Sequence, residues 1–148
     1  MDLEMLRHLF GNAILWTAAF AYAAAQTIKT LVYYKKHKKI NLYTFISSGG
    51  FPSSHSAFVM AATASIGFIE GFESSLFAMS AIISLIVMYD AAGVRRAAGN
   101  QAAAINKLFK SLENHGVSLD KALKELLGHT PVQVFVGAIL GIVVGLFA

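Results

Sequence analysis

The chain has 148 residues, of which 56% are hydrophobic and 14% charged, and its mean hydropathy is +0.60. Soluble proteins are roughly 45–50% apolar and about 25% charged, so this composition predicts a membrane protein. Zero cysteines exclude disulfides and thiolate chemistry. The net charge of +4 does not indicate nucleic-acid binding, because the lysines cluster beside apolar runs, and anionic membrane lipids are the expected partners. One domain over residues 1–148 is predicted.

Four apolar runs are expected to cross the membrane as helices. The first, residues 9–34, is long enough to span a bilayer. The second and third, residues 57–69 and 76–89, fall short of the roughly 20 residues that a span needs and must recruit flanking polar residues. A short polar loop joins them, so they form an antiparallel pair whose far ends, His55 and Asp90, share one membrane face. The last run covers residues 132–148.

Residues 49–57, GGFPSSHSA, precede the second run. The glycines and the proline predict a tight turn, after which Ser53 or Ser54 caps a helix running from His55 toward Ile69. Unpaired N–H groups at a helix start, with hydroxyls and an imidazole beside them, suit a phosphate or another oxyanion. The same residues also fit an ordinary helix cap, and the sequence leaves both interpretations open.

The segment at residues 97–127 differs from its neighbours. Apolar residues alternate with Asn, Gln, Lys and Glu at near-helical spacing, with a break at Gly116 and residues 118–121. This pattern predicts two amphipathic helices that lie on the membrane or in solution. In the last run, Gly137, Gly141 and Gly145 line one helix face and permit either close helix packing or dimerisation.

The basic residues give the expected orientation. They occupy residues 35–39, 95–96 and the segment before the last run, whereas the loop at residues 70–74 has no Lys or Arg. By the positive-inside rule, the basic face is cytoplasmic, in a protein expected in the cell membrane. An anion-binding site would produce the same asymmetry.

This topology gathers polar residues from four elements on one face. They are Lys29, Lys36, Ser53, Ser54, His55, Asp90, Arg95, Arg96 and His129. Cations that neutralise oxygens, one histidine that attacks and a second that protonates a leaving group suit phosphoryl transfer, with no metal or cofactor required. Plainer interpretations of these residues stay open. Most of the lysines can simply set the membrane orientation, Asp90 can form an ion pair with the arginines, and His129 can have a structural role. Lys29 is different, because a charge within an apolar run is costly if it faces lipid.

Three segments resemble the divergent PAP2 family, small membrane proteins related to acid phosphatases and vanadium haloperoxidases. They are residues 49–57, residues 89–101 (YDAAGVRRAAGNQ) and residues 127–131 (LGHTP), the last followed by GAILG at 137–141. The resemblance implies that Lys29 and Lys36 form a phosphate-binding pair, that Ser53 and Ser54 also bind phosphate, that His55 is the acid, and that His129 is the nucleophile.

The chain departs from the family pattern at two positions. Gln133 stands where an orienting Asp is expected, and Leu123 where an upstream Arg is expected. An amide can hold an imidazole but cannot stabilise an imidazolium by charge. Asp90 is therefore the candidate replacement for the carboxylate, and Arg95 and Arg96 for the cation.

The leading hypothesis is an all-α, polytopic, PAP2-like membrane bundle of about four transmembrane helices with an amphipathic segment on the cytoplasmic side. It hydrolyses a phosphomonoester or pyrophosphate on a phospholipid or isoprenoid through a phosphohistidine. The alternative is a non-catalytic protein that binds or transports an anionic phospholipid, which Gln133 and Leu123 favour. A structural oligomer built on the glycine face is the third hypothesis, and a homodimer that completes the site is compatible with four short spans.

Overall fold

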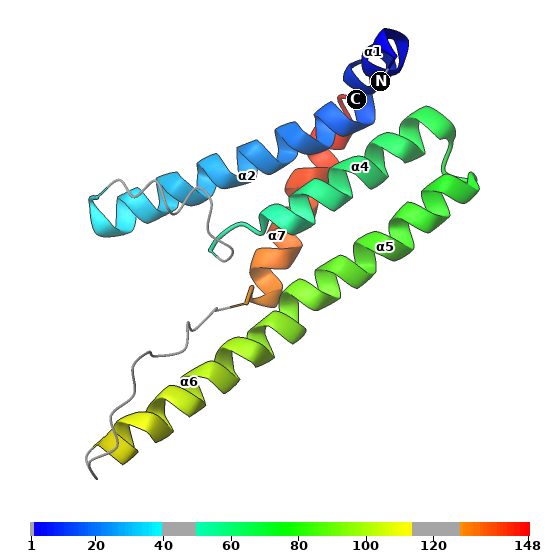
Figure 1. The fold of residues 1–148 in the computed structure, drawn as a ribbon. Coiled ribbons are helices and arrows are strands. Elements are labelled where there is room, and N and C mark those ends of the chain that lie inside the picture. The colour runs from blue at the N-terminus through cyan, green and yellow to red at the C-terminus, as the bar shows by residue number, and fades with distance from the viewer. Residues whose placement is uncertain (1, 40–49, 114–127) are drawn as a thin grey trace.

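The computed structural model describes residues 2–39, 50–113 and 128–148, and the regular structure in these ranges is all helical (Figure 1). The helices are α1 (Leu3–Phe10), α2 (Ala13–His37), α4 (Ser54–Glu70), α5 (Ser75–Ala92), α6 (Val94–Glu113) and α7 (Pro131–Gly145). The predicted all-α class is confirmed. The predicted break at Gly116 and residues 118–121 lies outside the described residues, as does Leu123.

Side-chain caps set where the helices begin. Asn12 accepts a hydrogen bond from the Leu15 N–H at 3.1 Å and starts α2. The first predicted helix, over roughly residues 9–34, corresponds to α2, and this cap moves its start to Ala13. Ser53 caps α4 by accepting from the Ser56 N–H at 3.3 Å, which confirms the predicted cap. Gly71, with φ of +92°, ends α4 in a conformation that favours glycine.

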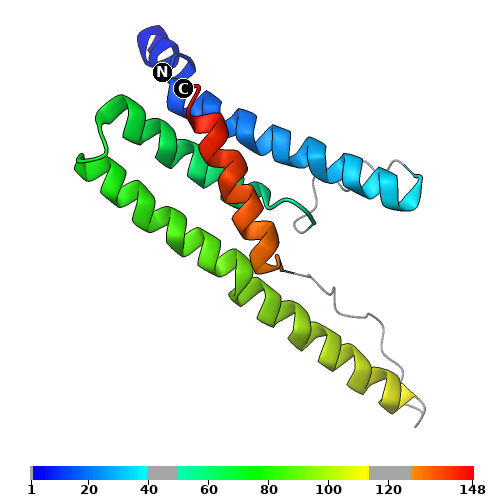
Figure 2. The same ribbon diagram turned by 180° about the vertical axis from the view of Figure 1, so that it is seen from behind.

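Helix α4 occupies the centre of the bundle and contacts α2, α5 and α7. Both views show α4 and α7 running in one direction and α2 and α5 in the other (Figures 1 and 2). One end of the bundle, here called the polar end, therefore gathers the starts of α4 and α7 and the ends of α2 and α5. The sequence predicts that His55 and Asp90 meet at this end.

Helix α7 packs on α4 through its glycine face. A Cβ at Gly141 would collide with the Ala57 carbonyl oxygen and stand 2.9 Å from the Ala61 nitrogen, and one at Gly145 would stand 2.6 Å from the Ala64 Cβ. Small residues let two helix backbones approach this closely. The glycines thus serve close packing within the chain, and α4 already covers the face on which the oligomer hypothesis depends.

The bundle is apolar on its outside and small or polar inside. The core cluster is made of alanines, namely Ala21, Ala25, Ala57 and Ala61. Large apolar side chains point outward instead, and Phe20, Ile86 and Phe135 are 63–66% exposed. Soluble proteins bury such side chains, because burial removes their apolar area from water.

Only one described segment is long and apolar enough to cross a membrane. It is Ser75–Ser111, which covers α5 and most of α6; its most apolar window of 18 residues has a mean hydropathy of 1.8 and is 11% buried. Pro131–Gly145 is apolar but shorter. Helix α2 has 25 residues, but alanines and polar side chains such as Gln26 and Lys29 dilute its hydropathy. The expected count of about four spans is therefore not confirmed by these criteria.

Candidate functional site

Two backbone hydrogen bonds tie the helix ends together at the polar end. The Ser53 N–H donates to the Gln133 carbonyl at 3.0 Å, which holds the start of α4 against the first turn of α7. The His129 N–H donates to the Ala91 carbonyl at 3.1 Å, which holds the start of α7 against the last turn of α5. Three elements far apart in the sequence are thereby fixed by the main chain, independently of their side chains.

Gln133 fixes both the orientation and the tautomer of His129. The Thr130 N–H donates to Gln133 Oε1 at 2.9 Å, and the Gln133 N–H donates to Thr130 Oγ1 at 3.4 Å, forming the capping box of α7. Because a backbone N–H can only donate, the amide oxygen is the atom that faces it. The same Oε1 lies 3.3 Å from His129 Nδ1. Since an amide oxygen can only accept, this contact favours a proton on Nδ1 of the neutral ring.

The Nε2 atom of His129 is buried and has no hydrogen-bond partner within the described ranges. Burial lowers the pKa of His129 below its ordinary value, and the charges of Lys29 and His55 lower it further, while the Gln133 bond and the Gly50 backbone act in the opposite direction. The ring is therefore mainly neutral at pH 7. A neutral imidazole with an available lone pair is the form that can attack phosphorus.

His55 lies beside this ring, in the first turn of α4. The two imidazole centroids are 6.0 Å apart, with their planes at 66°. His55 is half-buried, whereas His129 is 2% exposed. Both rings are within reach of one phosphate-sized group, and their different surroundings suit them to different roles in proton transfer.

Lys29 brings a buried cation to the same place. It is 2% exposed on α2, and its stem packs on Gly50, where a Cβ would stand 3.0 Å from the Lys29 Cγ. Gly50 has φ of +93°, so both its conformation and this close approach favour glycine. The Lys29 charge acts directly on His129. A buried cation beside two imidazoles is an arrangement that suits an anion.

The other predicted site residues differ in burial. Ser53 and Ser54 are buried at the start of α4, and the Ser56 hydroxyl donates to Ser53 Oγ at 3.0 Å. Asp90 is half-buried in the last turn of α5, next to the residue whose carbonyl holds His129. Lys36 and Arg96 are exposed, and the Arg95 side chain lies outside the description. The predicted residues that the structure brings together are the buried Lys29, Ser53, Ser54 and His129 and the half-buried His55.

Gln26 is a buried polar residue that the sequence patterns do not single out. It is 1% exposed and lies three residues before Lys29, on the same face of α2. Its Nε2 donates to the Tyr22 hydroxyl at 2.9 Å, and its Oε1 has no hydrogen-bond partner among the residues that the structure describes. An amide one turn from a lysine inside an alanine-rich run is the signal that points to it.

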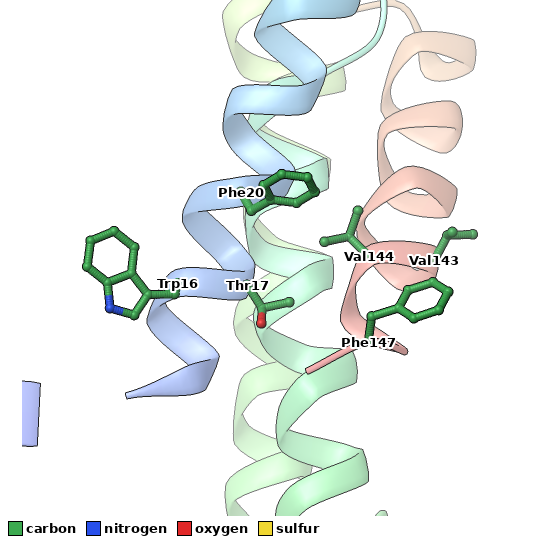
Figure 3. Close-up of a pocket in the computed structure, with 6 residues that line it drawn as sticks. All are labelled: Trp16, Thr17, Phe20, Val143, Val144 and Phe147. Carbon is green, nitrogen blue, oxygen red and sulfur yellow. The ribbon is translucent and has the colours of Figure 1, made fainter. Parts of the chain in front are cut away.

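The apolar cavities lie elsewhere in the bundle. One, of about 510 Å³, opens between α2 and the end of α7 and is lined by Trp16, Thr17, Phe20, Val143, Val144 and Phe147 (Figure 3). A second, of about 360 Å³, lies between α4, α5 and α7. Neither includes a histidine or Lys29. Within the described ranges, no group of three His, Cys, Asp or Glu side chains could hold a metal ion.

Comparison with known proteins identifies the family. The model of the divergent PAP2 family matches residues 10–144. The chain belongs to the divergent PAP2 family. It is 42% identical to the uncharacterized membrane protein YuiD of Bacillus subtilis (strain 168), over 93% of this chain and 94% of that protein. No solved structure matches it. The matched range includes Lys29, His55 and His129, so the buried polar cluster belongs to the family domain.

Proposed function

We propose that this chain is an integral membrane protein of about four transmembrane helices that hydrolyses a phosphomonoester or pyrophosphate on a phospholipid or an isoprenoid. The outward apolar side chains around an alanine core support insertion in lipid. The basic residues near the polar end support a cytoplasmic orientation of that end in the cell membrane. The observation that carries the reaction is the buried Nε2 of His129, which has no hydrogen-bond partner among the described residues, beside His55 and Lys29.

Short helices are compatible with this insertion. Helix α4 has 17 residues and α7 has 15, which corresponds to about 25 Å and 22 Å against a hydrocarbon core of about 30 Å. Local thinning of the bilayer and flanking polar residues accommodate a difference of this size at modest cost. The polar end then lies close to the lipid phosphates.

The proposed reaction has two steps. His129 Nε2 attacks the phosphorus, and the bond from phosphorus to the lipid oxygen breaks as protonated His55 gives its proton to that oxygen. Water then attacks the phosphohistidine and gives a proton to His55, which releases inorganic phosphate and restores neutral His129. Lys29 and the N–H groups at the start of α4 balance the charge on the phosphoryl oxygens.

The remaining candidates complete the site in this proposal. Ser53 and Ser54 hold phosphate at the start of α4, and Lys36, Arg95 and Arg96 supply further cations at the same end of the bundle. Asp90 is the candidate carboxylate for stabilising a charged imidazole. Asp90→Lys therefore slows phosphate release without unfolding the protein, and unchanged release removes Asp90 from the site.

Phosphate release by purified protein in detergent tests the proposal. A panel of phosphatidate, isoprenyl phosphate and isoprenyl pyrophosphate covers the substrate classes. His129→Ala should abolish release, and His55→Ala should lower it by about 10²–10⁴-fold, the usual contribution of general acid–base catalysis. His37→Ala is the matched control, because His37 is an exposed histidine that stacks on Tyr33. Release that survives His129→Ala contradicts the mechanism.

Gln133 favours a second function. Its amide orients His129 but supplies no negative charge, so the same pocket can bind or move an anionic phospholipid without hydrolysing it. That function predicts saturable phosphatidate binding that Lys29→Met weakens, with no phosphate released by folded protein. Turnover that depends on His129 excludes it.

A further inference from the structure

Helix α6 is amphipathic and extends away from the bundle. It contacts no other described helix than α5, whose line it continues (Figures 1 and 2). At 100° per residue, Val94, Ile105 and Leu108 fall on one stripe, and Lys107 and Lys110 fall on the other side. Leu108 is 60% exposed and Val94 59%. An apolar stripe of this kind normally packs against another surface.

The length of the α5–α6 run bears on what covers the stripe. Ser75–Ser111 has 37 residues, which corresponds to about 55 Å of helix against a hydrocarbon core of about 30 Å. Helix α5, with 18 residues, measures about 27 Å and nearly fills that core by itself. If α6 stayed in line with α5, its apolar stripe would therefore stand in water beyond the bilayer.

The charge of α6 selects the surface that it fits. Helix α6 carries four cations, Arg95, Arg96, Lys107 and Lys110, and one carboxylate, Glu113, at its last residue. This excess of cations complements anionic lipid head groups, and an apolar stripe opposite a basic face is the pattern of helices that lie in the membrane interface. Gly93 separates α5 from α6 and carries no side chain to resist a change of direction.

We propose that α6 lies along the cytoplasmic surface of the bilayer, with its apolar stripe at the acyl boundary, its cations among anionic head groups and the chain turning at Gly93. This inference depends on the proposed membrane insertion and not on hydrolysis. Since Ala91 holds the His129 backbone just before this turn, a docked α6 gathers anionic lipids beside the histidines.

Single-cysteine labelling tests the docking, because the chain has no cysteine of its own. Ile105→Cys lies on the apolar stripe, and Asn100→Cys, also exposed, faces away from it. Each full-length variant is labelled with an environment-sensitive fluorophore and reconstituted in liposomes of phosphatidylcholine with phosphatidylglycerol. The Ile105 label should emit at shorter wavelength and be quenched by lipid-borne quenchers, while the Asn100 label stays accessible to a water-soluble quencher. Two water-accessible labels on protein with unchanged helicity overturn the proposal.

Charge variants separate lipid from a protein partner. Lys107→Gln with Lys110→Gln should shift the docking equilibrium toward the undocked state by roughly 30-fold, a factor of about five for each cation near an anionic surface. Lys35→Gln with Lys39→Gln makes the same change in charge away from α6 and should leave the label unchanged. The Ile105 label could instead become more shielded as the protein density in the liposome rises, with no dependence on lipid charge. That result would identify a second copy of the chain as the occupant and would refute lipid docking. These label readouts do not involve phosphate release, so they stand or fall separately from the hydrolytic reaction.

Discussion

The two ends of the bundle carry different chemistry. At the polar end, Lys29 and His129 are each 2% exposed, and main-chain hydrogen bonds hold the helix starts around them. At the opposite end, α2 begins and α7 ends around an apolar cavity of about 510 Å³, to which Phe20 and Val144 contribute (Figure 3). There the Trp16 indole N–H donates to the Phe10 carbonyl at 2.7 Å.

This difference supports the proposed ligand site at the polar end. Apolar groups in contact with lipid need no specific partner, whereas a buried cation and a buried imidazole nitrogen lose hydration that must be compensated. Buried titratable groups that cluster in this way are typical of sites that bind or react. Variants that change one end and leave the other intact test this contrast.

The largest effect is expected at the interface that runs between the two ends. Gly141→Leu places a side chain where even a Cβ meets backbone atoms of Ala57 and Ala61, so the destabilisation exceeds the roughly 1–3 kcal/mol of ordinary overpacking. We expect loss of monodisperse protein in size-exclusion chromatography. Ala23→Leu makes a similar enlargement on the exposed face of α2 and should be tolerated. Normal folding of Gly141→Leu would contradict the packing described above.

Charging the polar end is expected to have the next largest effect. Gln133→Glu keeps the acceptor for the Thr130 N–H and adds a negative charge about where Oε1 lies 3.3 Å from His129 Nδ1. An opposite charge at this range raises an imidazole pKa by about 1 to 3, and phosphate release should rise roughly tenfold or more. Asn100→Asp, exposed on α6 away from its apolar stripe, is the matched amide-to-acid control. Slower release than in the wild type at a pH above the raised pKa, where the ring is neutral in both proteins, argues against attack by His129.

Replacing the buried amide of Gln26 tests whether a buried polar group at the polar end lowers stability. Gln26→Leu eliminates a buried oxygen without a described partner and should raise stability by about 1 kcal/mol and Tm by about 2–4 °C. Binding of phosphatidate should weaken in the same variant. Thr27→Val, on the exposed face of α2, should leave both quantities unchanged. A lower Tm for Gln26→Leu shows that the amide stabilises the fold.

The smallest effect is the titration of His129 itself. Its pKa lies below the ordinary 6.5, chiefly because it is buried. The unfolded chain therefore binds protons more readily, and stability falls as pH drops from about 6.5 toward the folded-state pKa. Histidine NMR, with assignment by His129→Asn, measures this directly. A pKa above 6.5 contradicts the burial of the ring.

The repeating parts of the fold are predictable from the sequence, and its junctions are less so. The apolar runs at 57–69 and 76–89 define the α4–α5 pair, and Ser53 is a cap that local chemistry predicts. The cap at Asn12 lies inside an apolar run, and a prediction based on hydropathy passes over a single capping residue there. Helix α6 starts at Val94, directly after Gly93, because the alanine-rich residues that follow have high helix propensity.

Some features of the candidate site are likewise predictable from the sequence, and others are not. The meeting of His55 and His129 follows from the order and direction of the helices. Gln133 acts as a cap and an orienting group at once, which depends on a side-chain rotamer that sequence spacing cannot specify. Lys36 lies seven residues from Lys29, on the same helix face, yet it is exposed. Sequence spacing predicts on which face of a helix a residue lies. It does not predict how far the neighbouring helices extend along that face, which decides whether the residue is buried.

Trapping the phosphorylated residue tests the attack by His129 most directly. Reconstituted protein is mixed with the lipid phosphate that it hydrolyses fastest, denatured in alkali, which preserves phosphohistidine, and analysed by peptide mass spectrometry. A phosphoryl group on His129 in the wild type, and none at that site in His129→Asn, is the predicted result. Continued phosphate release with His129 unmodified, or a phosphoryl group on another residue, would contradict it.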